Sequence, residues 1–230
     1  MELVLSPRLE AVASCVRDGA LLSDVGTDHA LLPAALLLSG RIRGAIASDI
    51  VKGPLERANE TVKKYGLSEK ITTLLTPGLC GLEKFSPTDI VIAGMGGHTV
   101  AEILKQAPFV KNKDVRLILQ PMTKGEILRD YLAKEGFEIL FEKRAREGER
   151  IYSILCCRYT GTPYTLSSLE LLLGKNDQET PDPLFCALLE KKREQLLAVV
   201  LAKGQNGVPC PEEIALLEEL ERALQDENTK

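Results

Sequence analysis

This 230-residue chain has few aromatic residues and few histidines, and its cysteines do not follow a motif spacing. Each of these shortages excludes a class of function. Trp is absent and aromatic residues make up 4%, so stacking on several bases, as single-strand binders use, is not supported. Two His residues, with no acidic pair at ligand spacing, argue against a metal site. The six Cys residues lack CxxC spacing, which favours reduced thiols in a cytoplasmic protein over a disulfide framework or a zinc site.

Long apolar runs are missing as well. The longest, Ala30 to Leu38, contains Pro33 and is too short to span a membrane. The opening residues lack a basic start followed by an apolar core, so we expect no secretory signal. With 44% hydrophobic and 27% charged residues, the composition is typical of a globular protein. We expect no membrane partner and a monomer or weak homodimer.

The net charge of −4 is unevenly distributed. From Tyr164 onward seven basic residues are outnumbered by thirteen acidic ones, whereas the preceding part is slightly basic. Nucleic-acid binding would therefore depend on local basic patches. The densest patch consists of Lys143, Arg144, Arg146 and Arg150. The same residues also fit a solvated turn between two strands.

Apolar runs alternate with helix-like stretches through residue 160. The expected strands are residues 20–24, 44–49, 71–75, 89–93, 115–120, 137–143 and 150–158, and the expected helices are residues 6–18, 30–39, 53–65, 98–106 and 123–135. Nearly continuous apolar runs predict strands buried on both faces of a parallel α/β sheet. No helix fits between the last two strands, so they should form an antiparallel hairpin. Such a Rossmann-like, mostly parallel seven-strand sheet with its last strand antiparallel is typical of class I S-adenosylmethionine (SAM) methyltransferases.

The composition changes after Pro163. Leucine and valine recur at helical spacing over residues 184–200 and again over residues 214–224, separated by the turn-like Gly204 to Pro211. We expect a catalytic sheet domain over residues 1–160 and an α-helical domain over residues 161–230. The latter should hold two antiparallel helices with a coiled-coil-like seam. This pair either packs against the sheet domain or holds a macromolecular substrate or a second subunit.

The segment Ser23 to His29 is the turn expected at the end of the first strand. It contains Asp24, Gly26 and Asp28 and opens onto a helix, and the second strand ends in Asp49. Ligands of doubly wound sheets bind at the carboxyl ends of neighbouring strands. An acid in that place can hold the two hydroxyls of a ribose. The pattern therefore predicts a pocket for a nucleoside-containing cofactor.

Charge favours SAM over a nicotinamide dinucleotide in this pocket. Gly26 is the only glycine of the turn, whereas the dinucleotide fingerprint needs three to approach a pyrophosphate. A carboxylate repels a pyrophosphate but attracts the ammonium and sulfonium of SAM. Asp28 has the alternative of capping the following helix, and His29 the alternative of a purely local hydrogen bond.

Two further segments follow strands. Gly94-Met95-Gly96-Gly97 comes after the fourth strand, where a flat base could slide against it. In Gln120-Pro121-Met122, after the fifth strand, Gln120 offers a donor and an acceptor for a base edge, Pro121 sets the chain direction, and Met122 can pack on an aromatic face. The ordinary alternatives are a tight turn and a strand exit.

A set of short segments together indicates a family. They are Leu5-Ser6-Pro7-Arg8-Leu9, Asp24-Val25-Gly26-Thr27-Asp28-His29-Ala30, Ser48-Asp49, Gly53-Pro54, Gly94-Met95-Gly96-Gly97 and Gln120-Pro121. Through roughly Tyr159 the chain resembles the TrmK-type bacterial tRNA (adenine-N1)-methyltransferases. This family transfers a methyl group from SAM to N1 of adenine 22 in tRNA, with a Rossmann-like catalytic domain and a C-terminal coiled-coil domain.

The resemblance implies a role for each motif. The implied cofactor-binding residues are Asp24, Gly26, Thr27, His29, Asp49, Ile50, Gly78 and Leu79. The implied catalytic residues are Asp28, Gly94, Met95 and Gly96. The candidate tRNA-binding residues are Gly97, Gln120, Pro121 and Met122, together with Lys143, Arg144, Arg146 and Arg150, whose charge suits tRNA phosphates. A noncatalytic SAM- or partner-binding module and an NAD-dependent oxidoreductase remain alternatives.

One segment departs from the family pattern. Thr76-Pro77-Gly78-Leu79 stands where related chains often carry Gly-Asp-Gly-Leu. The Asp of that pattern is expected to accept a hydrogen bond from the adenine amino group of the cofactor. Pro77 has no side-chain acceptor, so a backbone or other contact must replace it, and we expect weaker cofactor binding.

Overall fold

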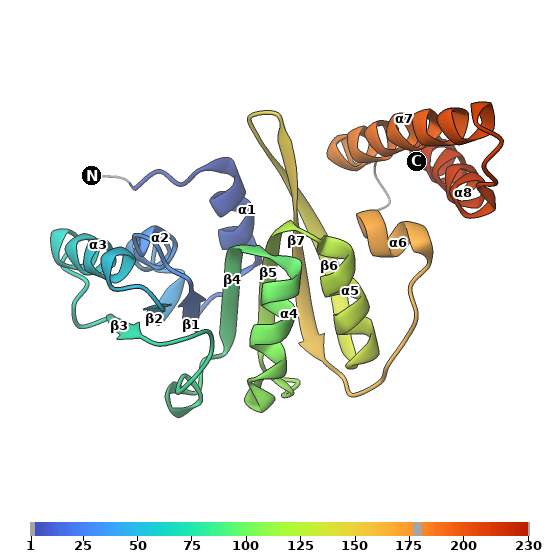
Figure 1. Cartoon of the computed structure of the whole chain (residues 1–230). Helices are drawn as coiled ribbons and strands as arrows, with labels where there is room; N and C mark the ends of the chain where they lie inside the picture. Colours follow the sequence, from blue (N-terminus) through green and yellow to red (C-terminus); the bar gives the residue numbers. More distant parts are fainter. Residues whose placement is uncertain (1–2, 177–180, 230) are drawn as a thin grey trace. The chain divides into compact units, whose positions relative to one another are not determined.

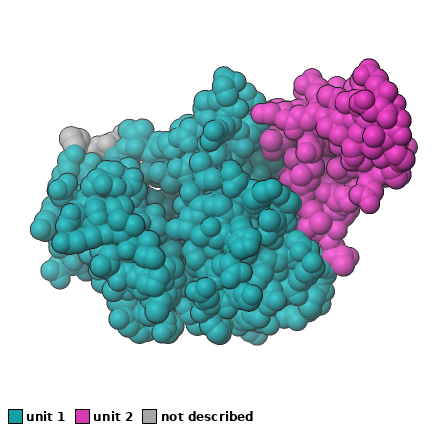
Figure 2. All heavy atoms as spheres, in the orientation of Figure 1, with its two compact units in different colours: residues 1–164 teal, residues 165–230 magenta. Residues whose placement is uncertain are grey.

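The computed structural model describes residues 3–176 and 181–229. The chain divides into two compact units, residues 1–164 and residues 165–230, coloured separately in Figure 2. We call them the sheet unit and the helical unit. The strands of the sheet unit are β1 (Ala20–Val25), β2 (Ile42–Asp49), β3 (Ile71–Leu75), β4 (Asp89–Gly96), β5 (Arg116–Thr123), β6 (Phe137–Glu147) and β7 (Arg150–Tyr159).

These seven strands form one sheet in the order β3-β2-β1-β4-β5-β7-β6 (Figure 1). Strands β1 to β5 pair in parallel, and β7 is antiparallel to both β5 and β6. The predicted Rossmann-like sheet with its antiparallel last strand is therefore confirmed. In this order β1 and β4 are central neighbours, so the segments that follow them lie at the same edge of the sheet.

Helices cover the sheet on both faces. They are α1 (Pro7–Cys15), α2 (Leu31–Leu38), α3 (Lys52–Lys64), α4 (Gly97–Lys105) and α5 (Gly125–Lys134), with short 3-10 helices η1 (Glu83–Phe85) and η2 (Pro108–Val110). One core joins α1, α2 and α3 to Leu22, Val91 and Ile118. The other joins α4 and α5 to Val25, Ile92 and Leu119. Because side chains alternate across a strand, each central strand supplies both cores, which explains the continuous apolar runs in the sequence.

Several strands extend further than the sequence predicts, β6 to Glu147 among them, and two of these extensions lie near the site. Strand β4 runs to Gly96 and β5 runs to Thr123, instead of ending at residues 93 and 120. Their pairing shifts register on both sides of Met95. The glycine-rich segment is therefore the bulged end of β4 and not a separate loop. A Gly at φ +86° in position 94 permits this bulge.

The helical unit contains α6 (Ser168–Leu173), α7 (Pro183–Gln205) and α8 (Pro211–Thr229). Phe185, Leu189 and Leu196 of α7 pack on Leu220 and Leu224 of α8. This core is shorter than the predicted seam, since Val199 and Ile214 are both 43% exposed. Helix α6 was not predicted, although its capping box at Ser167 and Glu170 is a signal that sequence can show. Within the described ranges, no helix combines the length and apolarity needed to cross a membrane.

Candidate active site

A cavity of about 750 Å³ opens at the carboxyl ends of the parallel strands. Six residues singled out from the sequence line it: Gly26, Asp49, Ile50, Gly78, Leu79 and Met95. Thr76 and Pro77, from the segment that departs from the family pattern, line it as well. Sequence reasoning missed other lining residues, among them Cys80, Glu83, Thr99, Ile103 and Phe109. Position after a strand could have indicated Cys80. Nothing local distinguishes Ile103 or Phe109 from core residues, because the fold alone brings α4 and η2 to this wall.

Gly26 follows β1 and lines the cavity. Its φ of +75° favours glycine, and a Cβ there would overlap the Cε methyl of Met95. The N–H groups of Gly26 and Thr27 donate to the Ser48 carbonyl oxygen at 2.8 and 2.9 Å, so the turn is tied to the end of β2. Met95 therefore lies over Gly26 and shapes the cavity from the β4 side.

Asp24 is buried beside the cavity without lining it. Burial is the main cause that raises the pKa of its carboxyl to about 6; a hydrogen bond from Thr27 opposes the shift and the nearby Asp49 carboxylate adds to it. At neutral pH the group is therefore a buried negative charge with little compensation. Such a charge favours a cationic ligand nearby, which makes Asp24 a source of negative potential for the cavity.

The helix that follows β1 has Ala30 as its N-cap residue and is capped by neither Thr27 nor Asp28. The Thr27 Oγ1 accepts from the Ala30 N–H at 3.1 Å, and Ala30 takes the left-handed conformation, with φ +51°. The capping alternative considered for Asp28 is therefore not seen. Its side chain is 64% exposed and available for another role.

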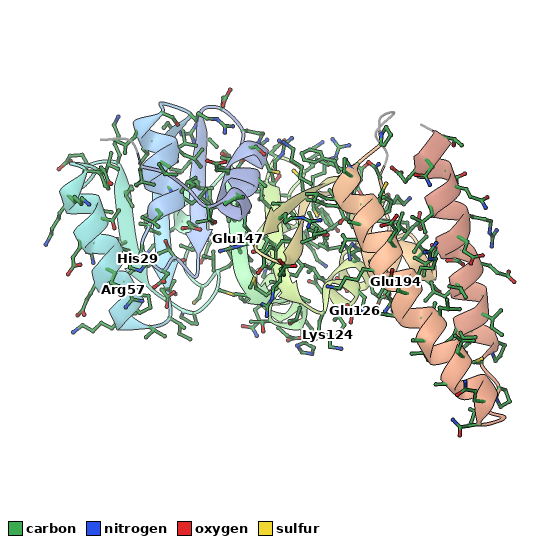
Figure 3. All side chains as sticks on the ribbon, turned by 90° about the horizontal axis from the view of Figure 1, so that it is seen from above. His29, Arg57, Lys124, Glu126, Glu147 and Glu194 are labelled. Atoms are coloured by element: carbon green, nitrogen blue, oxygen red, sulfur yellow. The ribbon has the colours of Figure 1, made fainter. Side chains whose placement is uncertain are left out.

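Asp28 does not line the cavity, and its carboxylate contacts the side chains of Arg57 and His29. Its carboxylate forms an ion pair with Arg57 of α3, and its Oδ2 lies 3.5 Å from Nε2 of His29. Figure 3 shows Arg57 and His29 next to each other at this edge of the molecule. His29 does not line the cavity, so its contact is the local one with Asp28. An ion pair this exposed contributes little to the free energy of folding. Its main effect is to orient the Asp28 carboxylate.

Gln120 does not present its amide to a base in this structure. The residue is fully buried, and Oε1 accepts from Arg8 Nη1 at 2.8 Å and from the Gly94 N–H at 3.2 Å. Its Nε2 donates to the Pro121 carbonyl oxygen at 2.9 Å. The prediction that Gln120 reads a base edge is corrected, because its donor and acceptor already bind protein groups. Pro121 and the half-buried Met122 belong to the bulged end of β5.

Gly97 opens α4 and is required by packing. A Cβ at this position would overlap the carbonyl group of Lys124, which precedes α5. Gly96 is less confined, since its Cβ would lie 3.3 Å from the Thr123 hydroxyl oxygen. The close approach of two backbones at Gly97 brings the ends of β4 and β5 together. The structure thus gives Gly97 a packing role, and its part in substrate binding stays a prediction.

The predicted basic patch is divided between two faces of the β6–β7 hairpin. Lys143 points toward α1, where its Nζ donates to the Ser14 hydroxyl at 2.9 Å. Arg144 and Arg146 share the opposite face with Glu142, because side chains two residues apart lie on one side of a strand. Arg146 and Arg150 are exposed near the hairpin end. The four residues therefore do not form one continuous surface.

The residues around the cavity fit SAM. Asp49 lines the wall at the end of β2, and the single Gly26 gives close backbone approach without the three glycines of a pyrophosphate site. The buried Asp24 adds negative potential, which suits a ligand with an ammonium and a sulfonium. Asp49, Gly26, Gly78 and Leu79 would hold the molecule.

Comparison with known proteins agrees with this geometry. Residues 5–155 match the family described as "Methyltransferase domain". The chain is 38% identical over 154 residues to the tRNA (adenine(22)-N(1))-methyltransferase of Bacillus subtilis strain 168, covering 67% of this chain and 65% of that protein.

Solved structures extend the likeness to both units. The Streptococcus pneumoniae protein Sp1610 in complex with S-adenosyl-L-methionine, described as a candidate tRNA (m1A22) methyltransferase, has a TM-score of 0.82 at 34% identity, covering 96% of this chain and all of that one. The B. subtilis m1A22 tRNA methyltransferase TrmK has a TM-score of 0.76 at 29% identity, with 99% of both chains covered. The chain belongs to the methyltransferase-domain family and, within it, to the TrmK-type tRNA (adenine-N1)-methyltransferases.

Proposed function

We propose that this protein transfers the methyl group of SAM to N1 of adenine 22 in tRNA. The observation that carries the proposal is the cavity bounded by Gly26, Asp49 and Met95 at the carboxyl ends of the parallel strands. Relatives of this chain are named for this activity, which supports the same conclusion. When bound, SAM supplies a methyl carbon that a nucleophile can attack. Holding two reactants in line accounts for roughly 7–11 kcal/mol of barrier reduction in well-oriented systems.

Each acidic side chain in or near the cavity has a separate role in this proposal. Asp49 holds the ribose hydroxyls, and the buried Asp24 attracts the cationic part of the cofactor. Asp28 orients the amino group of the target adenine, and its carboxylate offsets the positive charge that grows on the ring when N1 is alkylated. Arg57 and His29 hold that carboxylate in place. N1 lies on the Watson–Crick edge, so the adenine must be unpaired or flipped out before it reaches the site.

Methyl transfer to defined transcripts tests the function. Labelled SAM and unmodified tRNA should give incorporation that stops reverse transcription at adenine 22, and a transcript with guanine at position 22 should give none. A noncatalytic SAM-binding module would bind SAM in calorimetry without labelling either RNA. An oxidoreductase would instead change the fluorescence of added NADH. Either of these two outcomes contradicts the proposal.

Replacing Pro77 by Asp should tighten SAM binding by about tenfold, because a charged hydrogen-bond acceptor contributes about 1.5–3 kcal/mol. Pro77 lines the cavity, and the turn around it is held by other groups: Thr76 N donates to the Asp49 carbonyl oxygen at 2.9 Å and Thr76 Oγ1 to the Cys80 carbonyl oxygen at 2.8 Å. Calorimetry measures the change. Pro77→Ala separates the gained acceptor from the lost proline ring, and equal affinities in both variants would refute an adenine-reading role for this position.

Replacing Arg146 and Arg150 together by Ala should weaken tRNA binding and flatten its salt dependence. Each lost phosphate contact lowers the slope of log K against log salt by about 0.7–0.9, so two contacts lower it by about 1.5. Both residues are exposed at the hairpin end. The control is Lys105→Ala with Lys134→Ala, two exposed lysines in the last turns of α4 and α5. An unchanged slope in the arginine variant removes the hairpin from the tRNA interface.

A further inference from the structure

The N–H of Gly94 in the bulge of β4 is bound by a side chain of the neighbouring strand β5. In the β4–β5 register Ala93 is paired with Gln120 and Met95 with Pro121, which leaves Gly94 without a partner. Its N–H donates to Gln120 Oε1 at 3.2 Å instead. A glycine at φ +86° has no side chain to restrict it. The Gln120 amide is therefore a contact that restrains this part of the backbone.

Gln120 is itself held by four contacts, one of which joins its Nε2 to Met122 Sδ at 3.6 Å. Besides the Gly94 N–H, its Oε1 accepts from Arg8 Nη1 at 2.8 Å, and its Nε2 donates to the Pro121 carbonyl oxygen at 2.9 Å. Gln120 has no exposed surface, whereas Gly94 is exposed and Arg8 is partly exposed. A hydrogen bond from a guanidinium to a buried amide is stronger than one between neutral groups. Arg8, Gln120 and Gly94 thus form a connected network around the buried Gln120 amide.

Arg8 connects this network to the β6–β7 hairpin. It lies on α1, its Nε is 3.2 Å from Glu147 Oε2, and its guanidinium carbon is 5.8 Å from the centroid of the Tyr152 ring. Its side chain is 20% exposed. Two residues of the hairpin therefore orient the guanidinium that orients the Gln120 amide.

We propose that Arg8 and Gln120 are positioning residues of methyl transfer, which hold the Gly94–Gly96 backbone in the conformation that receives the target adenine. The inference rests on the proposed function for the identity of the substrate. The segment begins at the Gly94 bulge and includes Met95, whose side chain covers Gly26 in the cavity. A shift of the bulge moves Met95 and thereby the wall between the cavity and the substrate side. Neither Arg8 nor Gln120 lines the cavity, so they act through the backbone.

The variants Gln120→Met and Arg8→Met test the proposal. Gln120→Met keeps the side-chain volume and removes both the acceptor and the donor, whereas Gln120→Glu restores only the acceptor for Arg8 and Gly94. Exchange of the Gly94 amide proton, followed by NMR on 15N-labelled protein without ligands, should become at least tenfold faster in Gln120→Met and return toward the wild-type rate in Gln120→Glu. Turnover of tRNA should fall about 10- to 100-fold, as small misplacements at a reacting centre do, while the Kd for SAM in calorimetry stays within about twofold.

Arg41→Gln is the matched control. Arg41 fixes the other end of α1, donating to the Ala13 and Val16 carbonyl oxygens at 3.0 and 2.7 Å. The Arg41→Gln variant should lower the Tm, as Arg8→Met does. It should leave the exchange rate of the Gly94 amide proton and the turnover of tRNA unchanged. The proposal is overturned if Gly94 exchange is the same in Gln120→Met and wild type, or if Arg41→Gln loses as much turnover as Arg8→Met. If the wild-type protein methylates no tRNA, the proposed function fails, and Gly94 exchange still decides whether the network holds the bulge.

Discussion

Asp24→Asn should make the free protein more stable and make SAM bind less tightly. The Asp24 carboxyl is buried, and its pKa rises from 3.8 to about 6, which corresponds to about 3 kcal/mol of folding free energy at neutral pH. Asn keeps the shape and removes the charge, so the Tm should rise by several degrees, since 1 kcal/mol shifts the Tm of a domain this size by about 2–4 °C. Calorimetry should show SAM affinity lower by about 10-fold or more, because a buried charge interacts strongly with a cation.

The pH dependence of Asp24 has a definite sign. Its pKa is higher in the folded than in the unfolded state, so between pH 3.8 and about 6 the folded protein binds more protons. The contribution of this group to stability is fully present below pH 3.8 and is lost as the pH rises through 6. SAM binding should follow the opposite trend and weaken when the pH falls below 6.

Asp18→Asn is the control for both measurements, because the Asp18 side chain is 84% exposed and pairs with Arg41 away from the cavity. In Asp24→Asn the pH-dependent part of both stability and SAM affinity should disappear, and in Asp18→Asn it should persist. A lower Tm for Asp24→Asn together with unchanged SAM affinity would contradict the assignment of Asp24 as a charge held for the cofactor.

Asp28→Asn should reduce turnover of tRNA by about 100-fold or more, with SAM affinity unchanged. The expected loss is that of a charged group that stabilises or moves charge in the transition state. Asn retains the hydrogen-bond acceptor of the side chain and removes the negative charge that faces the ring. Single-turnover kinetics with saturating SAM and tRNA measures the change apart from binding and product release.

Two further variants separate the charge of Asp28 from its orientation. Arg57→Gln leaves the Asp28 carboxylate and removes its ion-pair partner, so turnover should fall by less than in Asp28→Asn. Asp18→Asn, which also breaks an aspartate–arginine pair at another edge of the sheet unit, should leave turnover unchanged. Full turnover by Asp28→Asn would mean that this aspartate has only a structural role.

Much of the sheet unit was predictable because its signals are local. Continuous apolar runs such as Ile90 to Ile92 require burial on both faces, and the absence of a helix between Phe137 and Tyr159 requires a hairpin. The acidic residues at the ends of the first two strands indicated a cationic nucleoside ligand. The charge of a side chain and its place at the end of a strand can both be recognised from a few neighbouring residues. The ends of β4 and β5 were placed too early, because glycine and proline usually mark turns and here mark bulges.

The sequence alone determined the alternation of strands and helices, the antiparallel hairpin and the strand-end residues Gly26 and Asp49 that line the cavity. Only the tertiary structure decided that Gln120 binds Arg8, 112 residues earlier in the chain, and that Arg57 of α3 reaches Asp28. It also decided that α4 and η2 form a wall of the cavity. The physical reason is that periodicity and charge act over a few neighbouring residues, whereas a hydrogen-bond partner is chosen by packing among distant elements.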